Sequence, residues 1–142
     1  MGFVFDFDPT HQILRSIFSG RVSDEDLLNH QRVGLLLVTS LDPRFAMIDF
    51  SAADPFEVTS DGMRKLAKLP PAMPKADRPR VIIAPTDHAF GMARIFEIEG
   101  EVTRPNLHVV RSAKEAFAIL GLEMEQAKFG PISGALPLQT SD

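Results

Sequence analysis

RVIIAPTDHAFGMARIFEIEG at residues 80–100 and NLHVVRSAKEAFAILGL at residues 106–122 decide the fold class of this chain. In each stretch a short apolar run, typical of a β-strand, leads directly into a helical pattern that opens with a capping residue. The strands are expected at Val81–Ala84 and Leu107–Val110. Strands that alternate with helices predict an α/β fold in which these strands are parallel.

The residues upstream of these stretches predict further elements of the same kinds. Apolar residues alternate near the N-terminus, as in strands, and then recur with helical spacing after polar caps. The expected elements are a hairpin at 3–7 and 12–18, a helix from Ser23 to about Ser40, a strand at Phe45–Phe50, a loop at Ser51–Val58, and helices capped by Thr59 or Ser60, by Thr86 or Asp87, and by Ser112 with Glu115. The sum is ββαβαβαβα, with a mixed, mostly parallel five-stranded sheet.

The length of the chain, 142 residues, suits a single domain. That domain is expected to cover residues 1–122, and the proline-rich segment Pro70–Pro79 is expected to run over its surface. Residues 123–142 contain two prolines and little periodicity. We therefore expect a C-terminal tail there that is mobile or packed against a partner.

Residue content excludes several classes of site. The chain has no cysteine, which excludes disulfides, thiol nucleophiles and thiolate metal ligands, and fits a reducing cytoplasm. Its four histidines show no ligand spacing, so no metal site is expected. GxGxxG, Walker A and GxSxG motifs are absent, so no cofactor is expected and an enzyme is disfavoured.

Charge and hydropathy exclude further partners. The formal net charge is −4 and the basic residues are scattered, which disfavours binding to nucleic acid or to an anionic membrane surface. The longest apolar run, Val33–Val38, is too short to span a bilayer, so we expect a cytoplasmic protein without a transmembrane segment. All 11 aromatic residues are phenylalanine, which indicates core rings or, alternatively, a Phe- and Met-lined pocket for an apolar ligand.

Three strand-to-helix turns are expected at the carboxyl end of the sheet, where open parallel sheets bind ligands. They are residues 49–61, 85–89 and 111–114. Asp49 ends its strand, either as a charge at the rim of a site or as a partner for nearby backbone N–H groups. Ser60 is either a phosphoacceptor, whose phosphate the helix dipole would hold, or a plain helix cap.

The third helix carries further candidate residues. Asp87 and His88 follow their strand directly, and they are either an acid/base pair or solvated residues of a first helical turn. Arg94 lies two turns further along the same face, where it either binds an anionic ligand or pairs with Asp87 or another carboxylate.

The element order and two segments, FGMARIF at 90–96 and VVRSAKEAFAIL at 109–120, resemble the STAS-like superfamily, which has the SpoIIAA-like fold of anti-sigma-factor antagonists. Within it the chain looks closest to the small stand-alone bacterial members. In these proteins an opening hairpin and a helix precede a strand that ends in Asp, as Asp49 does here. The resemblance covers residues 3–122.

This resemblance implies functional positions. In the antagonist branch, a D-S-S-G motif at the start of the second helix holds the phosphorylated serine. The matching stretch is Thr59-Ser60-Asp61-Gly62, so Ser60 falls on the phosphoacceptor and Gly62 on the glycine, while Thr59 and Asp61 depart from the motif. Asp61 already places a negative charge beside Ser60. Other relatives resemble lipid-transfer domains, which implies an apolar ligand between helices and sheet.

Three functional hypotheses follow. The first is a non-enzymatic regulatory or interaction module that binds a protein partner, or a second copy of itself, at the carboxyl end of the sheet. The second is a binding protein for a small apolar or amphipathic anion. The third is a small hydrolase or isomerase. The candidate residues of the first hypothesis are Asp49, Ser60, Asp61, Ser112 and the helix from Asp87. In the second hypothesis, Arg94 or a helix N-terminus binds the anionic head, and Phe90, Met92 and Phe96 surround the apolar tail. The third hypothesis relies on Asp87 and His88 as an acid/base pair.

Overall fold

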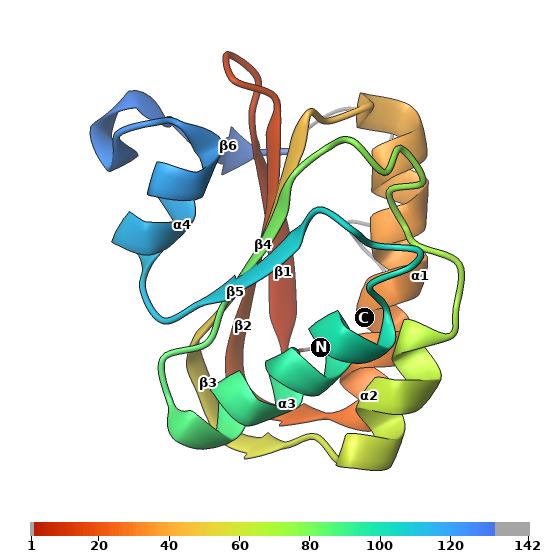
Figure 1. Cartoon of the computed structure of the whole chain (residues 1–142). Helices are drawn as coiled ribbons and strands as arrows, with labels where there is room; N and C mark the ends of the chain where they lie inside the picture. The colour runs from red at the N-terminus through yellow and green to blue at the C-terminus, as the bar shows by residue number, and fades with distance from the viewer. Residues whose placement is uncertain (1, 133–142) are drawn as a thin grey trace.

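The computed structural model describes residues 2–132 of the chain (Figure 1). The elements are β1 (Phe3–Asp8), β2 (Ile13–Ser23), α1 (Asp24–Leu41), β3 (Phe45–Glu57), α2 (Ser60–Ala67), β4 (Arg80–Ile83), α3 (Asp87–Glu99), β5 (Leu107–Val110), α4 (Ala113–Leu120), the 3-10 helix η1 (Met124–Gln126) and β6 (Gly130–Pro131). This order confirms the predicted α/β class. No helix within the described residues is both long and apolar enough to cross a membrane.

The strands form one mixed sheet in the order β5-β4-β3-β2-β1-β6. Neighbouring strands from β2 to β5 are parallel, whereas β1 is antiparallel to both β2 and β6. The prediction of five strands is wrong by one because Gly130 and Pro131 pair with Phe7 and Asp6. This short pairing covers part of β1, which would otherwise be an edge strand with unpaired backbone groups.

The beginning of the expected C-terminal tail contacts the domain itself. Phe129 packs edge-on against Phe117 of α4, and the Arg15 guanidinium of β2 lies 3.7 Å from the Phe129 ring centroid. These contacts hold the segment that leads into β6. Residues 133–142 of that expected tail lie outside the described residues, and the division of the chain at residue 122 stays a prediction.

Helices cover the two faces of the sheet unequally. Figure 1 shows α1, α2 and α3 on one side and α4 on the other. Between the sheet and α1–α3 lies the larger core, in which Phe18 is fully buried against Phe3 and Phe50. The smaller core, beneath α4, includes Ile13 and Phe117. Most phenylalanines of the chain lie in these two cores or pack against them, as the sequence indicates.

Strands β2 and β3 are longer than expected. β2 continues beyond Phe18, and β3 continues beyond Phe50 through the segment expected to be a loop, up to the pairing of Ser23 with Glu57. Pro55 does not prevent this pairing because it falls where the register shifts, between the Gly20–Ala53 and Val22–Phe56 pairs, so no ladder N–H is required of it. The extension reaches Val22, which is fully buried, and this burial favours the strand over a loop.

Candidate functional site

Three helices begin together at the carboxyl end of the sheet, at the lower end of Figure 1. Ser23 caps α1, Thr59 caps α2 and Thr86 caps α3, and each side chain accepts a hydrogen bond from a backbone N–H of its first turn. The sequence leaves open whether Thr59 or Ser60 caps α2, and whether Thr86 or Asp87 caps α3. In both cases the structure shows that the threonine is the cap. Each threonine lies just before its helix with extended backbone, as an N-cap does.

The start of α2 is already occupied by a carboxylate of the chain. Asp24 of α1 accepts hydrogen bonds from the Thr59 backbone N (2.9 Å) and from the Thr59 hydroxyl (2.6 Å). Ser60 is half-buried as the first residue of the helix, and Asp61 beside it is exposed. A phosphate on Ser60 would therefore join two carboxylates, Asp24 and Asp61, and their repulsion opposes the attraction of the helix dipole.

Gly62 makes the contact between α1 and α2 possible. A Cβ atom at this position would lie 2.3 Å from Cγ of Asp24, whereas a Cβ atom at Gly91 of α3 would meet nothing within 4 Å. We expect Gly62→Ala to lower the free energy of unfolding by about 1–3 kcal/mol, because the carboxylate must leave Thr59.

The matched control for this substitution is Gly91→Ala, which should be neutral or stabilising by up to about 1 kcal/mol through its higher helix propensity. Urea unfolding followed by circular dichroism measures both variants. Equal stability of the two variants would contradict the proposed role of Gly62.

Asp49 does not join this end of the sheet as a rim residue. It lies inside β3, paired in register with Ile17 and Ile83, because the strand continues to Glu57. Its side chain is on the face of the sheet opposite α1–α3, since the neighbouring Phe50 belongs to the core under those helices. There Asp49 Oδ1 accepts the Ser51 backbone N–H at 2.8 Å, which corresponds to the backbone-partner alternative.

The start of α3 holds an ion pair rather than an acid/base pair. Asp87 accepts a hydrogen bond from Arg111 Nη1 at 2.7 Å, and the same guanidinium stacks over the Phe90 ring at 4.1 Å. His88 is exposed, and its ring meets Phe56 edge-on with 5.7 Å between centroids. Within residues 2–132 no hydrogen bond joins Asp87 to His88.

The remaining predicted residues of α3 and α4 do not converge on one pocket. Arg94 is exposed and pairs with Glu97, so it lies apart from Phe96, which is buried. Met92 is half-buried against the core. Ser112 caps α4 by accepting the Glu115 N–H. The expected anion-binding pocket around Arg94 is therefore not formed by these side chains.

A cavity lies instead between the sheet and helices α1–α3, and Phe96 is the predicted site residue that reaches it. Its volume is about 110 Å³ and its walls are mostly apolar. The polar residues on its wall are Ser16, His30, Gln31, Arg80 and Arg104. An apolar cavity with a few convergent polar groups is the usual form of a small-molecule site.

Two of these residues are buried arginines, Arg80 and Arg104. Arg80 Nη1 donates to the carbonyl of Met73 at 2.8 Å, and Arg104 donates to the carbonyls of Ala67 and Leu69, both at 3.0 Å. Burial lowers the pKa of both guanidiniums, and for Arg104 burial together with the nearby charge of Arg80 lowers the pKa to about 10. Both remain cationic at neutral pH.

His30 of α1 closes another part of the wall. Its ring stacks on Phe5 at 4.9 Å between centroids and packs against Phe3 and Phe18. Nε2 lies 2.7 Å from the Ser16 hydroxyl, which is buried. Burial lowers the pKa of His30 to about 3, so the ring is neutral at neutral pH.

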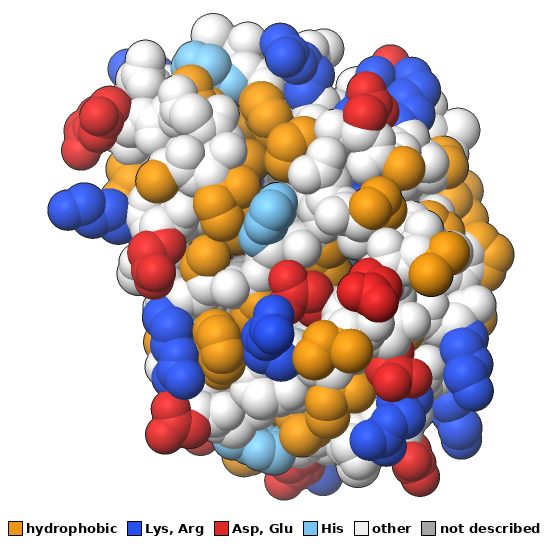
Figure 2. Space-filling model, in the orientation of Figure 1, with side chains coloured by type: hydrophobic (Ala, Val, Ile, Leu, Met, Phe, Trp, Pro, Cys, Tyr) orange, Lys and Arg blue, Asp and Glu red, His pale blue; other side chains and the backbone are white. Residues whose placement is uncertain are grey.

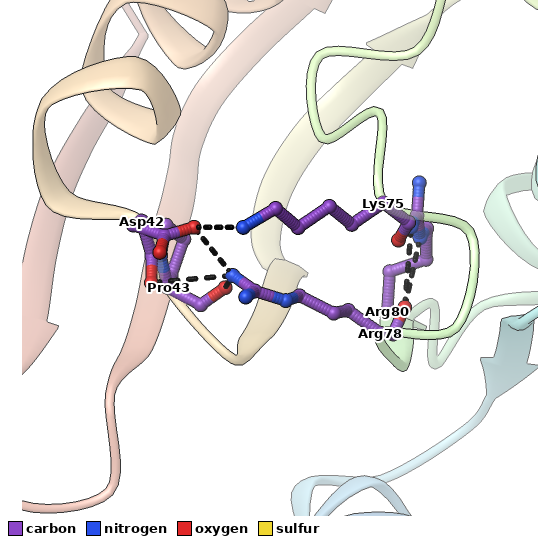
Figure 3. A network of polar contacts seen from close by, with 5 residues as sticks. All are labelled: Asp42, Pro43, Lys75, Arg78 and Arg80. Atoms are coloured by element: carbon purple, nitrogen blue, oxygen red, sulfur yellow. Dashed lines mark hydrogen bonds and ion pairs between the residues drawn. The ribbon is translucent and has the colours of Figure 1, made fainter.

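The loop between α2 and β4, residues 68–79, covers one side of the cavity with Ala72 and Met73. Figure 3 shows the side chains of Lys75 and Arg78 reaching from this loop to Asp42, after the end of α1. The distances to Asp42 Oδ1 are 3.1 Å from Lys75 Nζ and 2.6 Å from Arg78 Nη1. Both hydrogen bonds lower the pKa of Asp42, and the one from Lys75 has the larger effect. The loop is thus tied to α1 although most of it is exposed.

The resemblance to relatives that hold an apolar ligand between helices and sheet implies a cavity in this place, but the sequence does not indicate the buried arginines on its wall, because the rule for parallel sheets points to the carboxyl ends of the strands. Arg80 is the first residue of β4 and Arg104 precedes β5, so both lie at the amino ends. For Arg80, the sequence does contain a signal of burial. Arg80 directly precedes the apolar run VII in a strand buried at every position, and a charge buried there must have polar partners.

Comparison with known proteins identifies the fold. The structure of the Bacillus cell fate determinant SpoIIAA in its phosphorylated form matches this chain with a TM-score of 0.50 and 11% sequence identity, over 82% of this chain and 99% of SpoIIAA. No protein family's sequence profile matches the chain, and no curated protein matches its sequence. The chain has a SpoIIAA-like fold, as the resemblance in element order predicts.

Proposed function

We propose that this protein is a non-enzymatic regulatory module of the STAS type that binds a partner protein at the carboxyl end of its sheet. The fold supports this proposal, because the matching structure is that of a cell fate determinant which exists in a phosphorylated form. A fold alone does not define a function, so the surface at this end carries the argument.

The observation that carries the proposal is that the helix starts are filled by side chains of the chain itself. Asp24 occupies the start of α2, and Arg111 neutralises Asp87 at the start of α3. Thr59, Asp61, Asp87 and His88 remain exposed around these contacts. A surface of fixed, exposed polar groups suits recognition by another protein better than it suits chemistry on a small substrate.

The charges of this protein favour a protein partner over a polyanion. In Figure 2 the Lys and Arg side chains on the visible face are interspersed with Asp and Glu side chains. A nucleic-acid backbone requires several basic contacts on one surface. Interspersed charges instead provide specificity at the rim of a protein interface.

Partner binding should not depend on phosphorylation of Ser60, because Asp24 and Asp61 already supply negative charge beside it. The test is affinity capture from the source cells with the wild-type chain and four variants. We expect one partner to be retained by the wild type, by Ser60→Ala and by Ser60→Asp, and to be reduced at least tenfold with Asp61→Lys combined with His88→Glu.

The fourth variant, Glu101→Lys, is the matched control. Glu101 is exposed and follows the C-terminal end of α3, the end opposite His88. This variant should retain the partner. Retention by the Asp61→Lys/His88→Glu variant would refute the proposed surface, and loss with Ser60→Ala alone would show a phosphorylation switch instead.

A further inference from the structure

Two buried cations border the cavity without a carboxylate to balance them. Arg80 and Arg104 are 7% and 4% exposed. Within residues 2–132 no Asp or Glu oxygen lies within 4.0 Å of either guanidinium. The charge of Asp77 acts on Arg80 only from beyond that distance. Buried charges in proteins are usually paired, so this pair of cations favours a bound anion.

The hydrogen bonds of Arg104 leave one edge of its guanidinium free. Nη1 donates to Ala67 O and more weakly to Thr103 Oγ1, and Nη2 donates one hydrogen to Leu69 O. A guanidinium has five N–H groups, so Nε–H and the second Nη2 hydrogen remain without an acceptor in the described part of the chain. Nε–H and the Nη2 hydrogen beside it are the fork with which a guanidinium binds a carboxylate through both of its oxygens.

The same fork is used elsewhere in this chain. Arg15 donates from Nε to Asp6 Oδ1 at 3.0 Å and from Nη2 to Asp6 Oδ2 at 2.7 Å. Arg104 presents the same two nitrogens, and its guanidinium is stacked against Phe96 at 4.8 Å from the ring centroid. The stacking fixes the plane of the guanidinium, so the fork is oriented before any ligand binds.

The cavity limits the size of the ligand. A volume of about 110 Å³ is somewhat smaller than an apolar cavity that holds benzene, so the apolar part of a ligand is limited to about five carbons. Among the half-buried lining residues, Gln31 and Val38 belong to α1 and Ala72 to the 68–79 loop, so these three form the side of the cavity between that helix and that loop.

We propose that this cavity binds a small apolar monocarboxylate, with the carboxylate on the Nε–Nη2 fork of Arg104, beside Arg80, and the hydrocarbon part among the apolar residues of α1 and β3. This site goes beyond the proposed partner surface, because its two arginines lie at the amino ends of β4 and β5, whereas the partner surface lies at the carboxyl end of the sheet. Its apolar wall excludes water and strengthens the charge-assisted hydrogen bonds.

The proposal is tested by calorimetric titration of the full chain with hexanoate and with hexan-1-ol, which has the same chain length without the charge. We expect hexanoate to bind at least tenfold more tightly. With [1-13C]hexanoate, the carboxyl carbon should titrate at lower pH when bound than when free, because the guanidiniums favour its ionised form.

Three variants separate ligand binding from a purely structural role of the arginines. Ala46→Met fills the cavity from β3 and leaves both arginines in place, so it should abolish binding. Arg104→Lys keeps the charge but loses the fork, and should weaken binding about tenfold. Arg94→Lys on the exposed side of α3 is the control and should leave binding unchanged. If Arg104→Lys does not fold, the loss or retention of hexanoate binding in Ala46→Met still tests whether the ligand occupies the cavity.

Other outcomes would overturn the proposal. Equal affinity for hexan-1-ol would mean a purely apolar cavity, and no saturation by hexanoate at about 5 mM would mean no such site. Tighter binding of hexyl phosphate or of palmitate would assign the site to a phosphate-headed or a long-chain ligand instead. Unchanged affinity in Ala46→Met would place the bound acid elsewhere on the protein.

Discussion

Replacement of Phe18 by alanine is expected to lower the free energy of unfolding by about 4 kcal/mol, the largest effect of any single substitution considered. Phe18 is 0% exposed in the middle of β2. Its ring lies 5.3 Å from Phe3, 4.9 Å from Phe50 and 5.0 Å from His30, measured between centroids. The loss combines the transfer free energy of the ring with the void left among rings that cannot all move inward.

The comparison that isolates this effect is Phe90→Ala on α3. Phe90 is half-buried beneath Arg111, so its removal should cost clearly less than that of Phe18. Urea unfolding followed by circular dichroism gives both free energies of unfolding. If the slope of the free energy against urea concentration equals that of the wild type, the substitution has not changed the unfolded state. A loss below about 1 kcal/mol for Phe18→Ala would mean that the aromatic cluster does not organise the core.

Acid is expected to destabilise the fold through His30, well above the pH at which carboxylates titrate. The pKa of His30 is about 3 in the folded chain, against an ordinary value of 6.5. Between these values the unfolded chain binds the proton and the folded chain does not, so stability falls as pH falls below 6.5. The slope is about 1.4 kcal/mol per pH unit, which gives a loss of about 3 kcal/mol by pH 4.5.

The pH window separates His30 from the carboxylates. Asp8 and Asp42 have lowered pKa values, so they too lose their contribution on acidification, but only below their ordinary value of 3.8. Burial alone would raise the pKa of Asp8, but the hydrogen bonds that its carboxylate accepts from His11 and Thr10 outweigh this effect and lower the pKa. A measurement between pH 4.5 and 6.5 therefore reports mainly on the histidine.

Unfolding by urea at several pH values provides this measurement. His30→Gln keeps a hydrogen-bonding group beside Ser16 without a titrating proton, so its stability should be nearly flat in this range. His108→Gln, on β5, should retain the wild-type slope because His30 is still present. A wild-type slope in His30→Gln would show that another group is responsible.

Local signals in the sequence predicted most of the fold. Ser23 and Ser112 cap their helices as expected because a cap is recognised from residues within one helical turn. The apolar run Val81–Ala84 is buried at every position, as expected of a central strand. The opening hairpin, the four helices and the parallel strands followed from such patterns.

The errors concern contacts between distant segments. The continuation of β2 and β3 depends on pairing between residues more than 30 positions apart, and neither segment shows it alone. The same holds for β6, where a two-residue strand has no pattern of its own and exists because β1 offers it an edge. The expectation that Asp49 ends its strand fails for this reason.

The candidate site divides in the same way. The α/β class, the helix caps and the gathering of three helix starts at one end of the sheet follow from the amino-acid sequence, because periodicity and capping are properties of neighbouring residues. That Asp24 fills the start of α2, and that Arg80 and Arg104 border one cavity, follows from the packing of elements that are distant in the sequence. A cavity is what remains after side chains from several elements have packed, so its volume and its charges depend on all of them together.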